Sequence, residues 1–159
     1  MSRRTGGAFV VLAAVAAAAS VATAAMLLLR SGPGPSLLIG EEIFAQGIGP
    51  SGQAIERSGG LMGLAAGGCA SCHGSNGRGG RGLSALVRAP DITYTNLTDP
   101  RGMLLPNGRR GPSLTDQTIR LAVTDGTGPR GRTLSPAMPR WRLTGTEWAG
   151  LLAYLKTLN

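Results

Sequence analysis

The chain has 159 residues, of which 16 are Lys or Arg and 8 are Asp or Glu, so its formal net charge is +8. Aromatic residues make up only 4% of the chain and 26 residues are Gly, which leaves few large side chains for a core of ordinary size. A basic excess is compatible with nucleic-acid binding, but the arginines are scattered among Gly and Pro without aromatic interleaving or a known nucleic-acid motif. We therefore expect one domain with an appendage, and no nucleic-acid partner.

The first distinctive segment is apolar and uncharged. Residues 8–29 are 22 residues without a charge, and as a helix they would be roughly 33 Å long, enough to cross the hydrocarbon core of a bilayer. Arg3 and Arg4 precede the segment, and the positive-inside tendency places that end in the cytoplasm. This pattern predicts one transmembrane helix in a bacterial inner membrane, with everything after Arg30 in the periplasm.

A cleaved signal peptide is the alternative to an anchor. The Ala-Thr-Ala tripeptide at 22–24 has the small residues of a cleavage site. The apolar run continues past it through Leu29, however, and is longer than the core of a signal peptide. We therefore expect residues 1–35 to be a membrane anchor and a Gly- and Pro-rich tether, and residues 36–159 to be the folded domain.

The domain opens with a predicted helix over Ser36–Ala45. Ser36 is a candidate N-cap, and Leu37, Gly40 and Phe44 fall on one helical face. A glycine and an aromatic residue four positions apart allow another helix to cross closely. An ordinary amphipathic helix would show the same pattern.

A glycine-rich stretch follows this helix. Residues 47–82 contain 13 of the 26 glycines. Such a stretch is hard to accommodate in a compact domain, but it is reasonable where the backbone lies against a flat group, because a side chain would interfere there. We expect residues 47–66 to be an irregular excursion before the next helix.

The sequence Cys69-Ala70-Ser71-Cys72-His73 contains both cysteines and the only histidine of the chain. The pattern C-x-x-C-H is typical of covalent c-type haem attachment. Two thiols three residues apart lie on one side of a helical turn and can both add to vinyl groups on one edge of a porphyrin, while His73 reaches the iron as the proximal ligand. A structural zinc site needs about four ligands, a thioredoxin-like motif needs a βαβ setting, and a disulfide leaves the histidine unexplained. The prediction is one covalent haem c with its iron.

Further haem contacts are predicted after the motif. A ligating imidazole usually donates its other ring N–H to a carbonyl, and the carbonyl of Pro90 is the candidate acceptor. The alternative is a loop proline that only ends a segment. Candidate hydrogen-bond partners for the haem propionates, each of which could instead be a plain surface residue, are Tyr94, Thr95, Asn96, Arg101 and Arg109.

Two more helices and a stiff loop complete the chain. A capping sequence at 113–116 opens a helix to about Val123, and a second one at 144–147 precedes an amphipathic helix that should cross the first helix of the domain. Between them, Met138 lies between two prolines. Since the iron needs a sixth ligand and no second histidine exists, Met138 is the predicted thioether ligand, and His/Met ligation closes both axial positions.

The combined pattern resembles class I cytochrome c. The resemblance covers about residues 37–159 and consists of the first helix with Gly and Phe, C-x-x-C-H, Ala-Pro-Asp-Ile-Thr, Ser-Pro-Ala-Met-Pro and a last helix ending in Ala-Tyr-Leu-Lys. It implies an all-α fold wrapped on one haem, with Cys69 and Cys72 as thioether sites and with His73 and Met138 as axial ligands. The downstream half is also similar to the haem domains in cytochrome subunits of periplasmic alcohol and sugar dehydrogenases.

These features predict an electron-transfer protein and not an enzyme. It would be a membrane-tethered carrier that takes an electron from a quinol-oxidising complex or a periplasmic dehydrogenase and passes it to an oxidase or another acceptor. Arg78, Arg81 and Arg140 could form a basic rim for an acidic redox partner, although a solvated surface explains them equally well. Two alternatives remain: a fixed cytochrome c subunit of a larger respiratory or dehydrogenase complex, and an open-site haem sensor or peroxidase in which Met138 does not bind iron.

Overall fold

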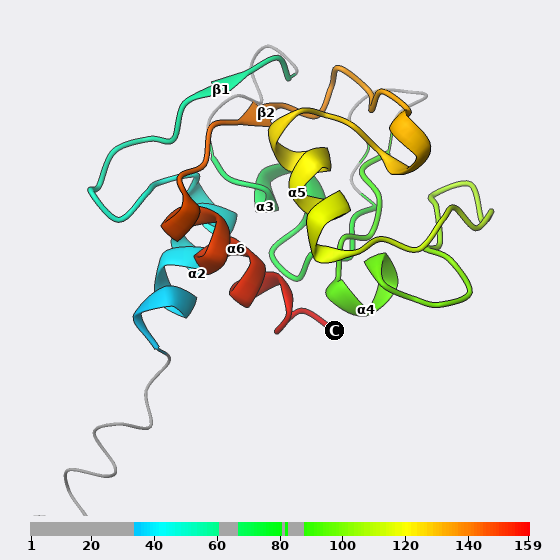
Figure 1. The fold of residues 1–159 in the computed structure, drawn as a ribbon, viewed down its shortest axis with the longest axis horizontal. Coiled ribbons are helices and arrows are strands. Elements are labelled where there is room, and N and C mark those ends of the chain that lie inside the picture. The colour runs from blue at the N-terminus through cyan, green and yellow to red at the C-terminus, as the bar shows by residue number, and fades with distance from the viewer. Residues whose placement is uncertain (1–33, 61–66, 81, 83–87) are drawn as a thin grey trace, which may run out of the picture. The chain divides into compact units, whose positions relative to one another are not determined.

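The computed structural model describes residues 34–60, 67–80, 82 and 88–159 (Figure 1). They belong to a unit that runs from Gly34 to Asn159. The predicted transmembrane segment, residues 8–29, lies outside the described residues. Among the residues that are described, no helix is both long enough and apolar enough to cross a membrane.

The unit is built mainly from short helices joined by long loops. In chain order its elements are α2 (Pro35–Gln46), β1 (Arg57–Ser58), α3 (Ala70–His73), α4 (Tyr94–Leu97), α5 (Asp116–Thr124), the 3-10 helix η1 (Pro129–Gly131), β2 (Arg140–Trp141) and α6 (Gly145–Leu155). The helical architecture agrees with the predicted fold class. The two short strands depart from a purely α-helical fold.

The first and last helices, α2 and α6, cross at a pair of glycines (Figure 1). A Cβ on Gly40 would overlap the carbonyl of Gly150, and a Cβ on Gly150 would lie only 2.8 Å from the carbonyl of Ser36. One turn further along, the rings of Phe44 and Tyr154 pack with centroids 5.2 Å apart. The predicted crossing is therefore confirmed, and it is close because neither helix has a side chain at the contact.

The start of α2 differs from the sequence prediction. Gly34 occupies the N-cap position, Pro35 is the first helical residue, and no described side chain caps the helix. Proline suits this position because its φ is preset and its missing N–H would have no helical partner, so Ser36 lies inside the first turn. The helix ends at Gly47, whose φ of +73° and N–H bond to the Ile43 carbonyl form a left-handed cap.

Both downstream helices begin with capping boxes. In α6 the backbone N–H of Thr144 donates to the Glu147 carboxylate at 2.8 Å, and the Thr144 hydroxyl accepts from the Glu147 backbone at 3.3 Å, as predicted. In α5 the capping residue is Thr115, which pairs with Thr118, and the helix begins at Asp116. The predicted helix is therefore present with a different capping pair.

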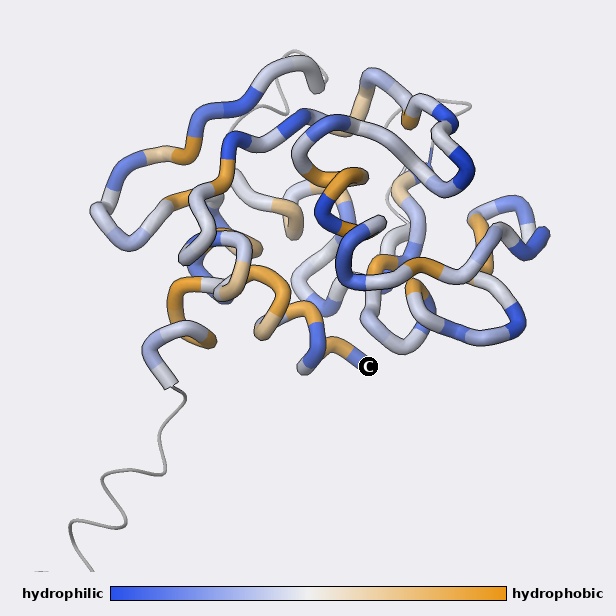
Figure 2. The backbone as a smooth tube through the Cα atoms, viewed as in Figure 1, coloured by the Kyte–Doolittle hydropathy of each residue, from blue (hydrophilic) through white to orange (hydrophobic). Residues whose placement is uncertain are grey.

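The core connects these elements. Figure 2 shows hydrophobic stretches on α2, α5 and α6. The most deeply buried large apolar side chains come from these helices, from α4 and from β2, and they are Ile43, Phe44, Leu97, Ile119, Trp141, Leu151 and Leu155. Trp141 belongs to β2, so the strand contributes directly to the core.

A two-stranded antiparallel ribbon joins the glycine-rich excursion to the loop before α6. Arg57 pairs with Trp141 and Ser58 pairs with Arg140. The predicted irregular excursion is thus partly regular over residues 47–60, while residues 61–66 lie outside the described part. The ribbon was not predicted because each strand is only two residues long and the strands are distant in sequence.

Candidate functional site

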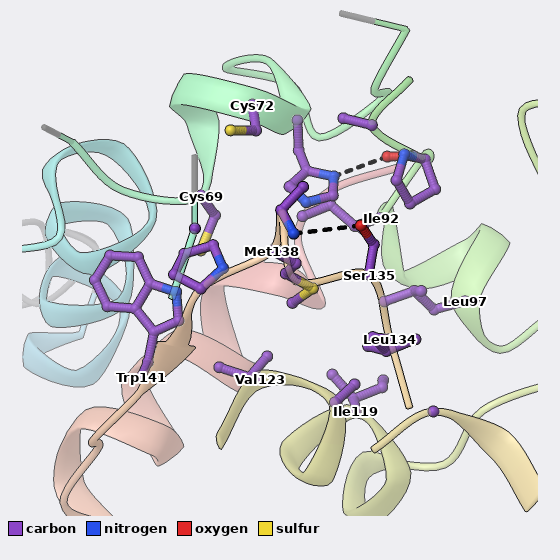
Figure 3. Close-up of a pocket in the computed structure, with 18 of the residues that line it drawn as sticks. Cys69, Cys72, Ile92, Leu97, Ile119, Val123, Leu134, Ser135, Met138 and Trp141 are labelled. Carbon is purple, nitrogen blue, oxygen red and sulfur yellow. Dashed lines mark hydrogen bonds between the residues drawn. The ribbon is translucent and has the colours of Figure 1, made fainter. Parts of the chain in front are cut away.

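A large apolar cavity lies among α3, α5 and the loop before β2 (Figure 3). Its volume is about 250 Å³, roughly twenty times the space that one buried water needs by a comparable measure. The apolar side chains around it include Ile92, Leu97, Ile119, Val123, Leu134 and Trp141. A cavity of this size and polarity can hold a large, flat, apolar group.

The single-turn helix α3 carries the C-x-x-C-H motif into this cavity. Cys69 and Cys72 both line it, and both thiols are free (Figure 3). Gly68 precedes the turn, and a Cβ there would overlap the backbone carbonyls of Ile43 and Phe44 at the end of α2. The glycine therefore lets the cysteine-bearing turn pack directly on α2.

The buried environment of Cys69 disfavours the thiolate form of its side chain. Burial raises the pKa of this thiol to about 12, so it stays protonated at neutral pH. Redox-active C-x-x-C motifs and reactive cysteines depend on a lowered thiol pKa. The raised pKa argues against a thioredoxin-like role.

His73 is buried, with 8% of its surface exposed, and lines the same cavity. Its Nδ1 lies 2.8 Å from the carbonyl oxygen of Pro90. Because a carbonyl can only accept, Nδ1 carries the proton and Nε2 keeps its lone pair. Burial lowers the pKa of His73 by more than the Pro90 carbonyl and the Asp91 charge raise it. The predicted hydrogen bond to Pro90 is therefore present, and the imidazole is neutral in the tautomer that can bind a metal through Nε2.

The glycines after the motif bring Pro90 to the histidine. The N–H of Gly79, at a φ of +68°, donates to the His73 carbonyl at 2.8 Å, and a Cβ on Gly79 would overlap the carbonyl of Pro90. Two residues earlier, the carbonyl of Gly77 accepts from the Ile92 N–H at 2.7 Å. The turn can close this tightly only without side chains.

Met138 reaches the cavity from the loop between η1 and β2 (Figure 3). Its N–H donates to the Ser135 carbonyl at 3.1 Å, and the N–H of Ala137 donates to the Ser135 hydroxyl at 3.3 Å. The sequence therefore places the methionine in a closed turn, which Pro136 and Pro139 stiffen further by restricting φ. The Met138 thioether, the two thiols and the imidazole thus line one cavity, and the buried side chain of Met103 lines it as well.

The comparisons with known proteins agree with this geometry. A family model described as cytochrome c matches residues 63–159, the greater part of the chain. The chain belongs to the cytochrome c family. No curated protein and no solved structure gives a significant match. Members of the family bind haem c covalently, and the spacing of Cys69 and Cys72 fits that attachment, so this cytochrome c carries a covalent haem c with its iron and has a haem-based electron-transfer role.

The residues of the cytochrome fit that cofactor. The apolar lining matches the flat face of a porphyrin, and its polar surface is small. Cys72 and His73 belong to α3 and Cys69 is its N-cap residue, while Met138 comes from a separate loop. When bound, the haem iron supplies one-electron redox chemistry.

The cavity, as far as the structure describes its walls, is not lined by any predicted propionate partner: Tyr94, Thr95, Asn96, Arg101 or Arg109. The Tyr94 hydroxyl instead donates to Asp116 at 2.8 Å, and Lys156 contacts the other oxygen of that carboxylate at 2.8 Å. Arg101 pairs with Asp99 at 2.9 Å. The Tyr94 hydroxyl therefore joins α4 to the start of α5, whereas Arg101 closes a local turn with Asp99.

Two arginines that line the cavity were not predicted. Arg57 donates to the Gly67 carbonyl at 2.5 Å, and its guanidinium lies 4.9 Å from the centre of the Trp141 ring. Arg88 donates to the Gly80 carbonyl at 3.2 Å. The local sequence does not mark Arg57, because its position depends on the pairing of β1 with β2.

Two of the three arginines predicted to form a basic rim donate to backbone carbonyls. Arg140 is half-buried, and its guanidinium donates to the carbonyls of Leu134 and Met138, so it is not a free surface cation. Arg78 is exposed, although it donates to the Asn159 carbonyl at 2.6 Å. The third predicted rim residue, Arg81, lies outside the described residues.

Proposed function

We propose that this cytochrome c is a single-haem electron carrier in which His73 and Met138 are the axial ligands. The observation that carries the proposal is that one cavity is lined by both residues together with Cys69 and Cys72. The two cysteines would hold the haem through thioether bonds. Nitrogen and sulfur ligands on the two faces would close both axial positions, so the iron would exchange electrons without binding a substrate.

Each ligand is prepared for this role by its surroundings. The bond from His73 to the Pro90 carbonyl orients the ring and strengthens it as a donor. Met138 is a neutral ligand in a stiff loop, and methionine ligation raises the reduction potential. The apolar lining acts in the same direction, because a low-dielectric environment disfavours the more highly charged oxidised state.

We also propose that residues 8–29 anchor the carrier in a bacterial inner membrane with its haem domain in the periplasm. The support is the uncharged apolar stretch preceded by Arg3 and Arg4. A tether would raise the effective concentration of the domain near membrane-bound partners. Those partners would be a quinol-oxidising complex or a dehydrogenase as donor and an oxidase or another protein as acceptor, in keeping with the resemblance to dehydrogenase haem domains.

The absorption spectrum of the oxidised holoprotein tests the ligation. Methionine coordination is expected to give a sulfur-to-iron charge-transfer band, together with slow binding of cyanide. A missing band and rapid binding of cyanide or CO by the unaltered protein would instead indicate an open-site sensor or peroxidase. The cysteine attachment is tested separately by peroxidatic staining of the protein on a denaturing gel.

Localisation needs a second experiment. Full-length protein should remain in the membrane fraction after a high-salt wash, and a variant starting at Ser36 behind a cleavable export signal should be recovered as a soluble periplasmic protein. Purification in mild detergent then separates the two membrane models. Recovery alone fits a tethered carrier, whereas stoichiometric co-purification with other chains fits a fixed subunit.

A further inference from the structure

The side chain of Arg140 is bound to the backbone of the loop that carries Met138. Nη2 donates to the Leu134 carbonyl at 3.0 Å, and Nη1 donates to the carbonyl of Met138 itself. The Ser135 carbonyl lies between them, 3.4 and 3.5 Å from the two nitrogens. A planar guanidinium presents several donors in a fixed fork, so one side chain spans the loop from beginning to end.

This guanidinium occupies a site that the surrounding backbone is shaped to receive. Gly126 has a φ of +66°, and a Cβ there would overlap the Arg140 guanidinium. The Gly126 carbonyl accepts from the Leu134 N–H at 2.8 Å, which ties the end of the α5 segment to the start of the Met138 loop. Among the described residues, no carboxylate forms an ion pair with Arg140. Backbone carbonyls are therefore its acceptors.

The backbone of Arg140 is itself fixed by the ribbon. It lies in β2 opposite Ser58, and the neighbouring Gly60 donates its N–H to the Pro136 carbonyl at 3.0 Å. The glycine-rich excursion thus holds the loop at Pro136, and the Arg140 side chain holds it on both sides of that point, at Leu134 and Met138. Both attachments restrict the motion that would carry Met138 away from the cavity.

We propose that Arg140 is a positioning residue for Met138 and sets how readily the thioether leaves the iron. The inference rests on the proposed function, because it requires Met138 to be a ligand. The role differs from the predicted docking rim, since a docking residue would affect partner binding without affecting exchange of the axial ligand.

The test compares Arg140→Leu with Arg142→Leu in the holoprotein. The Arg142 side chain is 80% exposed, and its one ion pair among the described residues is a 3.5 Å contact with the exposed Glu56. Its removal therefore controls for loss of one positive charge near the loop. Loss of the charge-assisted bonds in Arg140→Leu should accelerate imidazole binding to the oxidised protein by about tenfold or more. It should also weaken the sulfur-to-iron band and speed hydrogen exchange at the Met138 amide. The rate of imidazole binding to Arg140→Lys should lie between the rates for the unaltered protein and for Arg140→Leu, because one ammonium cannot span the loop.

A second pair of variants keeps the arginine and removes its site. Gly126→Ala should displace the guanidinium, whereas Gly131→Ala, at a φ of +73°, meets no described atom within 4 Å. Both substitutions put alanine into a left-handed conformation, so their difference isolates the contact with Arg140. Faster imidazole binding in Gly126→Ala alone is the expected result, and this pair decides the matter if Arg140→Leu does not accumulate with haem.

The outcomes separate the two proposals. Wild-type imidazole binding and an unchanged band in both Arg140→Leu and Gly126→Ala would overturn the positioning role of Arg140. Wild-type imidazole binding in Met138→Ala would instead overturn the axial assignment itself. An altered salt dependence of electron transfer with unchanged imidazole binding would return Arg140 to the docking rim.

Discussion

Replacing Gly40 with alanine should break the packing of α2 on α6. In an exposed helix the change would stabilise the protein by about 1 kcal/mol through helix propensity. Here the new Cβ would overlap the Gly150 carbonyl, and a backbone group in the middle of a helix cannot turn aside. The helices must separate, which loosens Phe44 and Leu151, each only 1% exposed. Overpacking costs about 1–3 kcal/mol, and partial exposure of these two side chains adds to it, so we expect a net loss of about 2 kcal/mol.

Urea unfolding of the holoprotein, followed by far-ultraviolet circular dichroism, measures this loss as a shift of the midpoint at unchanged slope. Gly145→Ala is the matched control. It lies at the start of α6, and a Cβ there meets no described atom within 4 Å, so its stability should be equal or slightly higher. Equal stability of Gly40→Ala and Gly145→Ala would refute the argument that the crossing requires glycine.

Three further predictions concern the haem site and the helix ends. Met138→Ala should lower the reduction potential in a redox titration and let CO bind the reduced protein. Replacing both Cys69 and Cys72 with alanine should abolish the peroxidatic stain of the denatured protein. Hydrogen bonds from Lys156 and Tyr94 lower the pKa of Asp116. The contribution of this carboxylate to stability is therefore complete above the ordinary carboxyl pKa of about 4, and it is lost as the pH falls through the lowered pKa. Asp116→Asn should therefore be less stable at pH 7, with the difference shrinking below about pH 4 in urea titrations.

Each of these predictions has a control. Met103 is buried in the core and also lines the cavity. Met103→Ala therefore compares the loss of either thioether, and CO binding equal to that of Met138→Ala would count against the axial assignment. A haem stain that survives loss of both cysteines would contradict covalent attachment. For the carboxylate, Asp125→Asn provides an exposed comparison, and an Asp116 difference that is independent of pH would argue against the ionic tie.

The ribbon gives the long excursion a structural role. Arg57 joins the segment before the cysteines to the ring of Trp141, and Gly60 binds the Met138 loop. The stretch therefore links two of the segments that reach the cavity, the one that carries the thiols and the one that carries Met138. The excursion, which its glycines predicted to be irregular, thus holds the cysteine segment and the Met138 loop in place.

The sequence by itself determined the chemistry, because that information is local. Five adjacent residues, 69–73, predict the attachment of haem, and two prolines beside Met138 mark a stiff loop. The sequence also predicts the start of a helix where a capping side chain bonds a backbone group three residues away, as with Thr144 and Glu147. The Pro90 acceptor could be predicted as well, because a ligating histidine needs a carbonyl for its second nitrogen.

Tertiary structure alone decided which polar side chains face the cavity. Arg57 reaches it and Tyr94 does not, since the tyrosine hydroxyl is taken by Asp116. Arg140 reads as a surface cation in the sequence but binds the Met138 loop. The physical reason is that each of these positions depends on segments far apart in the chain, paired through two-residue strands or single hydrogen bonds. Such pairings leave no periodic pattern in the residues that make them.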